Sequence, residues 1–346
     1  MTTTTGLAGL AYPITQISLA VSDLDATMAR YHQAFGWAPW QVFDHVLPVH
    51  HDTELRGRPV HYALHGAEVY VGAMNFELLE PLEGPNLWSE FIDRRGEGIA
   101  SIATMFHERV DGDAVKTAFL ERFGIPVSMR AEIGDHIEYY YLDTEERFGC
   151  LIESGSGHAI DFVRPARIHP SPDALPGPSP ATGLDCPLTQ VSIVVRDLDA
   201  RLRAWHGAFG WGPWQVFDST ATSGLLRDCR LGDRSVDPFA VRWAQARVDD
   251  TNVELIEPLG GPSPWQQFLE ETGEGIASIG ITLRTTAEVD RLAAYFDTLG
   301  IGQRASASVG GAARWALFDT TASFKCLIAA GTGHALDVLE GGEAYP

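Results

Sequence analysis

Residues 13–44, PITQISLAVSDLDATMARYHQAFGWAPWQVFD, return at residues 187–218 as PLTQVSIVVRDLDARLRAWHGAFGWGPWQVFD, identical at 20 of 32 positions. A second block, NFELLEPLEGPNLWSEFIDRRGEGIASI at residues 75–102, recurs as NVELIEPLGGPSPWQQFLEETGEGIASI at residues 252–279. The copies are about 175 residues apart, which is the size of a whole domain and far longer than a solenoid repeat. The chain is therefore predicted to be a tandem duplication of two domains.

The predicted domain boundaries follow from the composition between the two copies. Residues 166–184 contain HPSPDALPGPSP, a proline-rich stretch with little capacity to pack. We therefore predict a first domain at residues 1–165, a linker at residues 166–184 and a second domain at residues 185–346. Each domain is long enough to bury a hydrophobic core of its own.

Each half is in turn predicted to contain two similar modules with the order βαβββ. Residues 14–22 have the alternating, β-branched pattern of a strand, and Asp23 and Gly36 flank a helix as its N-cap and its stop. Further strands of this module are predicted at residues 40–43, 60–64 and 76–79. The next module repeats the order, with a strand at 101–106, a helix at 113–123 and strands at 126–131, 137–143 and 150–153. The predicted fold class is α+β, with four modules in two domains.

The composition argues against several kinds of partner. The net charge is −21 at pH 7, and a protein this acidic repels phosphate backbones and anionic lipids. We therefore expect a small-molecule partner, with neither nucleic acid nor a membrane; no apolar run is long enough to span a bilayer. The four cysteines form no CxxC pair and the N-terminus lacks a signal-peptide pattern, so we expect a cytoplasmic protein. A homodimer is compatible with the sequence.

The module symmetry predicts where a site would lie. Gln16 and Ser101 each lie on the first strand of a module, and Glu77 and Glu153 each lie on the last strand. Two modules packed about a pseudo-twofold axis would turn these four side chains towards one concave sheet surface. The first half is therefore predicted to hold a pocket with two carboxyl groups.

These features resemble the vicinal oxygen chelate superfamily, which includes glyoxalase I, methylmalonyl-CoA epimerase and extradiol dioxygenases. The matching motifs are a Gln seven residues before an Asp, as in Gln16 and Asp23, together with the strand FELLEPL, the turn GEG and the ending LIE. The likeness covers nearly all of both halves and is nearest to methylmalonyl-CoA epimerase-like members. It implies a pocket that holds a divalent metal through one ligand from each of four strands.

Carried over to this chain, the resemblance implies Gln16, Glu77 and Glu153 as metal ligands, in the first half only. The third position, usually His, is Ser101 here, and the second half has Ala329 in place of Glu153. Oxygen ligands suit Mg²⁺ or Mn²⁺, whereas imidazole favours Zn²⁺ or Fe²⁺. The expected cofactor is therefore none or a divalent metal, with Mn, Mg, Fe and Zn all open. Gln16 could instead serve the scaffold by bonding backbone, since both copies keep this residue.

Two carboxyl groups in one pocket can also do chemistry without a metal. Like charges that are close together and partly desolvated raise one pKa, which yields an acid and a base from one pair. We assign Glu153 and Glu77 as this catalytic pair, with Gln16 and Ser101 as substrate-binding residues. The predicted function is an isomerase, epimerase or lyase that transfers a proton on a small or medium carbonyl compound.

Histidine and aromatic residues add further candidates in the first half. Nine histidines lie there, against only His206 and His334 in the second half. We take His61, near a predicted central strand, as a candidate general base or extra ligand. Trp40 and Phe43 could line an apolar pocket for an aromatic substrate, although such residues more often belong to the core.

Two other functions remain open at this point. One is a metal-dependent enzyme of the glyoxalase or dioxygenase type. The other is a non-catalytic protein that binds or sequesters an aromatic small molecule, similar to bleomycin-resistance proteins. We favour an enzyme of the isomerase or lyase type over both.

Overall fold

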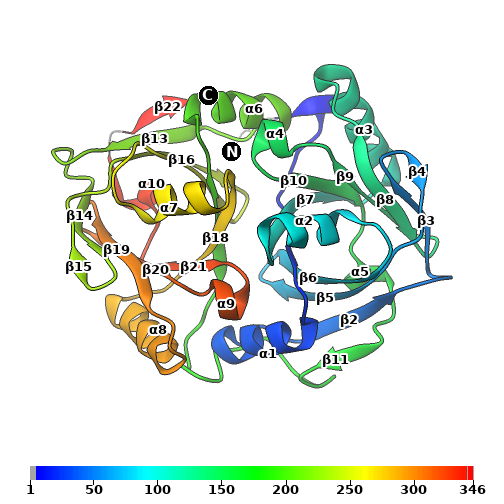
Figure 1. Ribbon diagram of the computed structural model, residues 1–346, viewed down its shortest axis with the longest axis horizontal. Helices are drawn as coiled ribbons and strands as arrows, with labels where there is room; N and C mark the ends of the chain where they lie inside the picture. Colours follow the sequence, from blue (N-terminus) through cyan, green and yellow to red (C-terminus); the bar gives the residue numbers. More distant parts are fainter. Residues whose placement is uncertain (1–4, 341, 346) are drawn as a thin grey trace. The chain divides into compact units, whose positions relative to one another are not determined.

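The computed structural model describes residues 5–340 and 342–345 and divides the chain into two compact units. The first unit comprises Met1–Gly177 with Gly207–Gly210, and the second comprises Pro178–His206 with Trp211–Pro346. Each unit contains one mixed sheet of eleven strands, flanked by helices (Figure 1). The predicted α+β class with tandem, repeated modules is confirmed.

Two βαβββ modules form the sheet of the first unit. The first module consists of β1 (Gln16–Ala20), α1 (Leu24–Phe35), β2 (Trp40–His45), β5 (Ala63–Val71) and β6 (Met74–Glu83). The second consists of β7 (Gly98–Phe106), α3 (Arg109–Phe123), β8 (Val127–Ile133), β9 (Ile137–Leu142) and β10 (Leu151–Ser156). The strand order is β11-β2-β5-β6-β1-β7-β10-β9-β8-β3-β4. The first strands of the two modules, β1 and β7, therefore pair antiparallel near the centre.

Shorter elements complete the first unit. A hairpin of β3 (His50–Leu55) and β4 (Arg58–Pro59) leaves the first module and joins the second, where β3 pairs with β8. Strand β11 (Arg167–His169) pairs with β2, although it belongs to the segment expected to be a linker. The remaining helices are η1 (Leu7–Gly9), α2 (Leu87–Arg95), α4 (Glu145–Phe148) and α5 (Ala159–Phe162).

The second unit repeats this plan around the antiparallel pair β12 and β18. Its first module consists of β12 (Leu188–Val194), α6 (Leu198–Phe209), β13 (Trp214–Ser219), β16 (Val241–Val248) and β17 (Thr251–Pro258). Its second consists of β18 (Gly275–Thr282), α8 (Thr286–Thr298), β19 (Gln303–Val309), β20 (Ala313–Phe318) and β21 (Leu327–Gly331). The other elements are β14 (Leu226–Leu231), β15 (Arg234–Ser235), α7 (Pro264–Glu271), α9 (Thr321–Phe324), α10 (Ala335–Val338) and β22 (Glu343–Tyr345).

One strand prediction in the first unit is corrected by the structure. The strand predicted at residues 60–64 lies later, because β5 spans Ala63–Val71. Strand β3, which opens at His50, was not predicted. Short runs of mixed residues carry little periodicity, so their strands depend on the neighbours that they pair with.

The segment between the two modules, around Trp88 and Phe91, forms helix α2. It begins at Asn86, whose side chain accepts a hydrogen bond from the backbone N–H of Ser89 at 2.8 Å. Leu87, Trp88 and Phe91 are buried on the concave side of the sheet, in the same core cluster as residues of β5, β6 and β9. Helix α2 therefore forms part of the wall of the space on the concave side of the sheet.

Side chains alternate between the two faces of each strand. On β1, Gln16 and Ser18 face the concave side, while Ile17 and Leu19 face the opposite side, where they are fully buried. A strand with one apolar and one polar buried face is unusual for a core, because buried polar groups need partners. The polar face of β1 is therefore a candidate location for a functional site.

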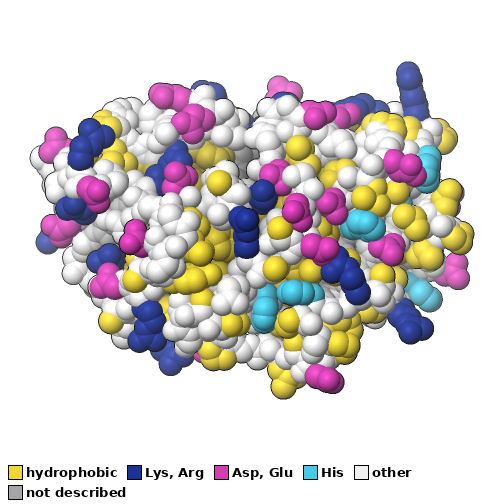
Figure 2. Space-filling model, turned by 60° about the horizontal axis from the view of Figure 1, so that its bottom comes forward, with side chains coloured by type: hydrophobic (Ala, Val, Ile, Leu, Met, Phe, Trp, Pro, Cys, Tyr) yellow, Lys and Arg dark blue, Asp and Glu magenta, His cyan; other side chains and the backbone are white. Residues whose placement is uncertain are grey.

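The surface carries charges of both signs. Figure 2 shows acidic and basic side chains interspersed over the visible face, with histidines gathered on one part of it. Across the residues that the structure describes, no helix is both long and apolar enough to cross a membrane.

Helix α1 offers a test of the local signals in the repeated block. The Asp23 carboxylate accepts a hydrogen bond from the backbone N–H of Ala26 at 2.9 Å. We predict that Asp23→Ala lowers the free energy of unfolding by about 1 kcal/mol, because one N-terminal donor loses its partner. Asp23→Asn keeps a side-chain acceptor and should retain most of this free energy, as measured by urea unfolding. An Asn variant as unstable as the Ala variant would contradict this role.

Candidate active site

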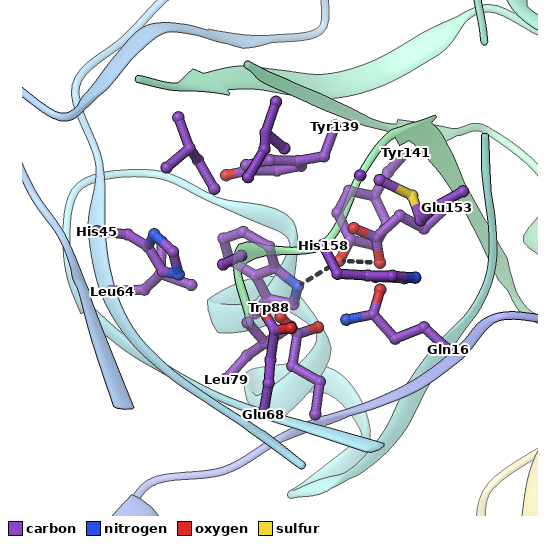
Figure 3. A pocket seen from close by; sticks show the side chains of 16 residues that line it. Gln16, His45, Leu64, Glu68, Leu79, Trp88, Tyr139, Tyr141, Glu153 and His158 are labelled. Carbon is purple, nitrogen blue, oxygen red and sulfur yellow. Dashed lines mark hydrogen bonds between the residues drawn. The ribbon is translucent and has the colours of Figure 1, made fainter. Parts of the chain in front are cut away.

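A cavity of about 390 Å³ lies on the concave side of the first sheet. Figure 3 shows Gln16, Tyr141 and Glu153 on one side of it and His45 on the opposite side. Sixteen residues line it: Gln16, His45, Leu64, Glu68, Glu77, Leu79, Trp88, Met105, Ile133, Ile137, Tyr139, Tyr141, Glu153, Gly157, His158 and Ala159. These come from both modules, so the cavity depends on their pairing.

Three carboxyl groups lie in this cavity without a basic partner among its lining residues. Glu68, Glu77 and Glu153 are only 2%, 7% and 5% exposed. Burial, which penalises the charged form, raises the pKa of Glu68 to about 7 and that of Glu153 to about 8. Burial and then the neighbouring Glu153 raise the pKa of Glu77 well above its usual range. The site therefore has groups that can exchange protons near neutral pH.

Each of these carboxyls is oriented by a neutral hydrogen-bond donor. A neutral donor favours the ionised form but supplies no compensating charge, so it offsets only part of the burial penalty. The donors are the Ser18 hydroxyl to Glu77 at 2.6 Å, the Tyr141 hydroxyl to Glu153 at 2.7 Å, and the Asn75 amide to Glu68 at 2.6 Å. The indole N–H of Trp88 in turn donates to the Tyr141 hydroxyl at 3.3 Å.

Gln16 has a buried amide that the protein leaves without a hydrogen bond. Its side chain is 3% exposed and points into the cavity (Figure 3), and none of the described residues bonds to it. An amide that lines a cavity and has no partner in the protein is available to the contents of that cavity. It can offer either its oxygen or its N–H groups to water or to a bound molecule.

The donor set suits a divalent cation that prefers oxygen ligands. Gln16, Glu77 and Glu153 supply an amide oxygen and two carboxylates, which are typical ligands of Mg²⁺ and Mn²⁺. His158 also lines the cavity, and burial lowers its pKa to about 4, so its imidazole is neutral. The unpartnered Gln16 amide and the uncompensated carboxyls fit a bound cation.

A different group of side chains lies close enough together to hold a metal ion on distance alone. Among the described residues, only His51, Asp52 and Glu132 form a group of three such side chains whose ligand atoms all lie within 4.8 Å of one another. None of the three lines the cavity, and Glu132 already pairs with Arg109 at 2.7 Å. The exposed acidic group is therefore explained by ion pairing.

The structure does not bring four of the predicted site residues into the cavity lining. Ser101 is fully buried on β7, where it lies opposite Ser18 and below the surface of the cavity. His61 is exposed and pairs with Glu83 at 3.0 Å. Trp40 packs on Tyr31 and Phe76, and the buried Phe43 stacks on His45 with a centroid distance of 6.0 Å. Gln16, Glu77 and Glu153, in contrast, share the cavity.

The sequence analysis missed Glu68 and Tyr141. Both are revealed by strand register, because residues directly opposite each other share a face: Glu68 is opposite Glu77, and Tyr141 is opposite Glu153. The sequence alone does not give this register. It could have suggested Tyr141, because Tyr139 and Tyr141 alternate on a predicted strand that neighbours Glu153.

The second unit has a cavity at the equivalent place, with about 530 Å³ of space and different chemistry. Glu254, the counterpart of Glu77, is its only carboxyl. By strand register, Gln245 stands in place of Glu68, and Ala329 and Leu317 stand in place of Glu153 and Tyr141. Among the described residues that line it, the second cavity thus keeps one carboxyl, Glu254, and lacks the partner that Glu153 provides in the first.

Comparison with known proteins finds a family match in the second half of the chain. The sequence pattern of the glyoxalase/bleomycin resistance protein/dioxygenase superfamily matches residues 189–301, about a third of the chain. No curated protein matches the sequence.

Several solved structures are similar to this chain in fold. A mutant of 4-hydroxymandelate synthase from Streptomyces coelicolor is similar, with a TM-score of 0.55 and 12% identity, over 93% of this chain and 92% of that one. The Mn(II)-bound glyoxalase from Novosphingobium aromaticivorans has a TM-score of 0.46 and 15% identity, over 93% and 82%. Methylmalonyl-CoA epimerase from Mycobacterium tuberculosis has 0.32 and 17%, over 45% and 93%. At these identities the likeness is one of fold.

The names of these structures describe different activities, a synthase, a glyoxalase and an epimerase. A fold does not determine the chemistry, so the function of this chain depends on its own cavity.

The raised pKa of Glu153 makes a prediction about stability. The folded protein keeps this carboxyl protonated up to about pH 8, whereas the unfolded chain releases the proton near its ordinary value of 4.5. The contribution of Glu153 to the free energy of unfolding is therefore fully present below pH 4.5 and is lost as the pH rises through 8. We predict that Glu153→Gln gains stability relative to the wild type across this window, by up to about 1.4 kcal/mol per pH unit.

Urea unfolding at pH 5, 6, 7 and 8 measures this difference. Glu121→Gln, which changes an exposed carboxyl of the same unit that pairs with no histidine among the described residues, is the control and should give a nearly constant difference. A constant difference for Glu153→Gln as well would contradict a buried, mostly neutral Glu153.

Proposed function

We propose that the cavity of the first unit is the active site of an isomerase or epimerase that moves a proton next to the carbonyl of a small or medium compound. The observation that carries this proposal is the pairing of Glu77 and Glu153, two buried carboxyls with raised pKa values and no basic partner in one cavity. Such a pair can hold one proton between them, so that one member is a base and the other an acid. The raised pKa of Glu153 means that the pair reaches this state towards pH 8.

The reaction follows from the placement of these groups. The ionised carboxyl of the pair takes the proton from the carbon beside the carbonyl, and the electron pair of the broken C–H bond moves onto the carbonyl oxygen. The Gln16 amide N–H, which has no partner among the described residues, donates a hydrogen bond to that oxygen. The protonated carboxyl then returns a proton to carbon, on the opposite face or at the neighbouring atom.

Two extensions follow from the same chemistry. If the next carbon of the substrate carried a leaving group, the electron pair would expel it, and the enzyme would be a lyase. Trp88 and Tyr139 line the cavity beside the carboxyls, so they suit a substrate with an apolar or aromatic part.

Glu153→Gln should lower turnover by a factor of 100 or more, because the amide cannot accept the proton. The assay follows deuterium exchange from D₂O into a panel of small carbonyl compounds. The matched change in the second unit, Glu254→Gln, should leave most of the activity, since Glu254 has no carboxyl partner there.

Equal losses from these two changes would contradict a single active cavity in the first unit. Exchange that the wild type does not accelerate for any compound of the panel would argue against proton transfer as the reaction. A folded Glu153→Gln variant, checked by circular dichroism, makes either result interpretable.

A metal-dependent reaction of the glyoxalase or dioxygenase type is the second candidate. The observation that favours it is the oxygen donor set of Gln16, Glu77 and Glu153, with an amide that no described residue engages. These residues would hold the cation, which would supply a positive charge to polarise a bound substrate oxygen. In that case the two carboxyls would be ionised ligands rather than an acid and a base.

Metal analysis of the purified full chain separates the two candidates. The proton-transfer proposal predicts less than 0.1 equivalent of Mn, Fe, Zn or Mg after dialysis, and activity that a chelator leaves intact. About one equivalent of metal that is lost in Glu77→Gln and kept in Glu254→Gln would favour the metal-dependent reaction instead.

A further inference from the structure

The cavity of the second unit is a separate feature that the proposed reaction does not use. Its lining is apolar apart from four side chains, and it contains three tryptophans. The lining residues are Gln190, Leu226, Val241, Trp243, Gln245, Glu254, Ile256, Trp265, Val309, Trp315, Gly333, His334 and Ala335. A large concave apolar pocket with few polar groups is the usual form of a small-molecule site.

The polar side chains of this cavity are already occupied by one another. Glu254 accepts hydrogen bonds from the amide of Gln190 at 2.9 Å, from Ser192 at 2.7 Å, and from the amide of Gln245 at 2.8 Å. The Gln190 oxygen lies 2.8 Å from His334 Nδ1. The Gln245 oxygen accepts from the backbone N–H of Leu336 at 3.1 Å. Among the described residues, the Glu254 carboxylate and the side-chain oxygens of Gln190 and Gln245 in this lining are thus engaged, unlike the Gln16 amide of the first cavity.

The charges of the cavity argue against an ionic ligand. No Lys or Arg is among its lining residues, and burial lowers the pKa of His334, which stays neutral, so an anion would lack a counter-charge. Glu254 offers little to a cation, because both of its oxygens already accept hydrogen bonds and burial raises its pKa. The cavity therefore favours an uncharged molecule.

The aromatic wall arises from paired replacements. In the first unit, His45 lies close to Gly66. A Cβ atom added at Gly66 would be only 2.8 Å from His45 Nε2. By strand register, Ser219 replaces His45 and Trp243 replaces Gly66, so the smaller serine leaves room for an indole. A second indole, Trp315, occupies the position of Tyr139.

The tryptophans present flat faces. The rings of Trp265 and Trp315 stack with a centroid distance of 5.2 Å and an interplanar angle of 27°. Trp243 stacks in the same way on Phe217, at 5.2 Å and 28°. Trp265 and Trp315 are only partly buried, so part of their ring surface remains open. Aromatic faces favour other flat rings, which add stacking to the area that they bury.

We propose that the cavity of the second unit is a binding site for an uncharged aromatic compound, which it holds without transforming it. The site lacks the paired carboxyls and the free amide that the first cavity offers for proton transfer. It is also independent of the proposed reaction, because it rests on the residues of the second unit alone.

Isothermal titration of the full chain with three probes of similar ring size tests the charge preference. The probes are 1-naphthol, which is neutral at pH 7, 1-naphthoate, which is an anion, and N-methylquinolinium, which is a cation. We expect saturable binding of 1-naphthol and at least tenfold weaker binding of the two ions. Equal or tighter binding of either ion, or no saturable binding of 1-naphthol at millimolar concentration, overturns the proposal.

Matched variants then place the bound probe. Trp315→Ala should weaken 1-naphthol binding at least tenfold, and Trp315→Leu, which keeps apolar bulk without the ring, at least threefold. Tyr70→Ala, which removes an exposed aromatic side chain of the first unit outside its cavity, should leave that affinity unchanged. Loss with Tyr70→Ala, or unchanged affinity in both Trp315 variants, overturns the proposal. The Leu variant keeps the test valid if the Ala variant does not fold.

Discussion

The antiparallel pairing of β1 with β7 is the constraint on which the first cavity depends. Strand β1 also runs parallel to β6, and β7 runs parallel to β10, so this single pairing joins the last strands of both modules through their first strands. Ser18 lies opposite both Glu77 and Ser101, while Ala103 lies opposite both Gln16 and Glu153. Two carboxyls that are 76 positions apart in the chain thereby come to face one space. A shift of one residue would turn both away.

The two units show how one scaffold can hold different electrostatics. In the first, three buried carboxyls accept hydrogen bonds from neutral donors only, and their pKa values rise because burial is not compensated by an opposite charge. In the second, one carboxyl receives three neutral donors, and glutamine replaces one of its acidic neighbours. The first arrangement costs folding free energy that the second largely avoids. Uncompensated groups of this kind gather at functional sites, which is why the first cavity is assigned the reaction.

The sequence predicted the parts of the site that repeat and missed those that depend on register. The duplication aligned Gln16 and Glu77 with Gln190 and Glu254, and the module symmetry added Glu153. His61 was taken as a central-strand residue because the strand was predicted at residues 60–64. The structure begins β5 at Ala63, so His61 precedes the strand and is exposed. Glu68 lies on that same strand, and only the pairing of β5 with β6 sets it beside Glu77.

A single methyl group accounts for the different behaviour of the two repeated glutamines. The residue between Gln190 and Ala329 in the sheet is Gly280, and a Cβ at Gly280 would lie 2.8 Å from the Cβ of Gln190. Gln190 can use that space, and its amide reaches Ser192 and Glu254. The first unit has Ala103 at the equivalent place, so its methyl group occupies the space and Gln16 must adopt another position. In that position the Gln16 amide faces the cavity and joins no hydrogen-bond network. The amide of Gln16 is therefore available for chemistry, whereas that of Gln190 is already engaged.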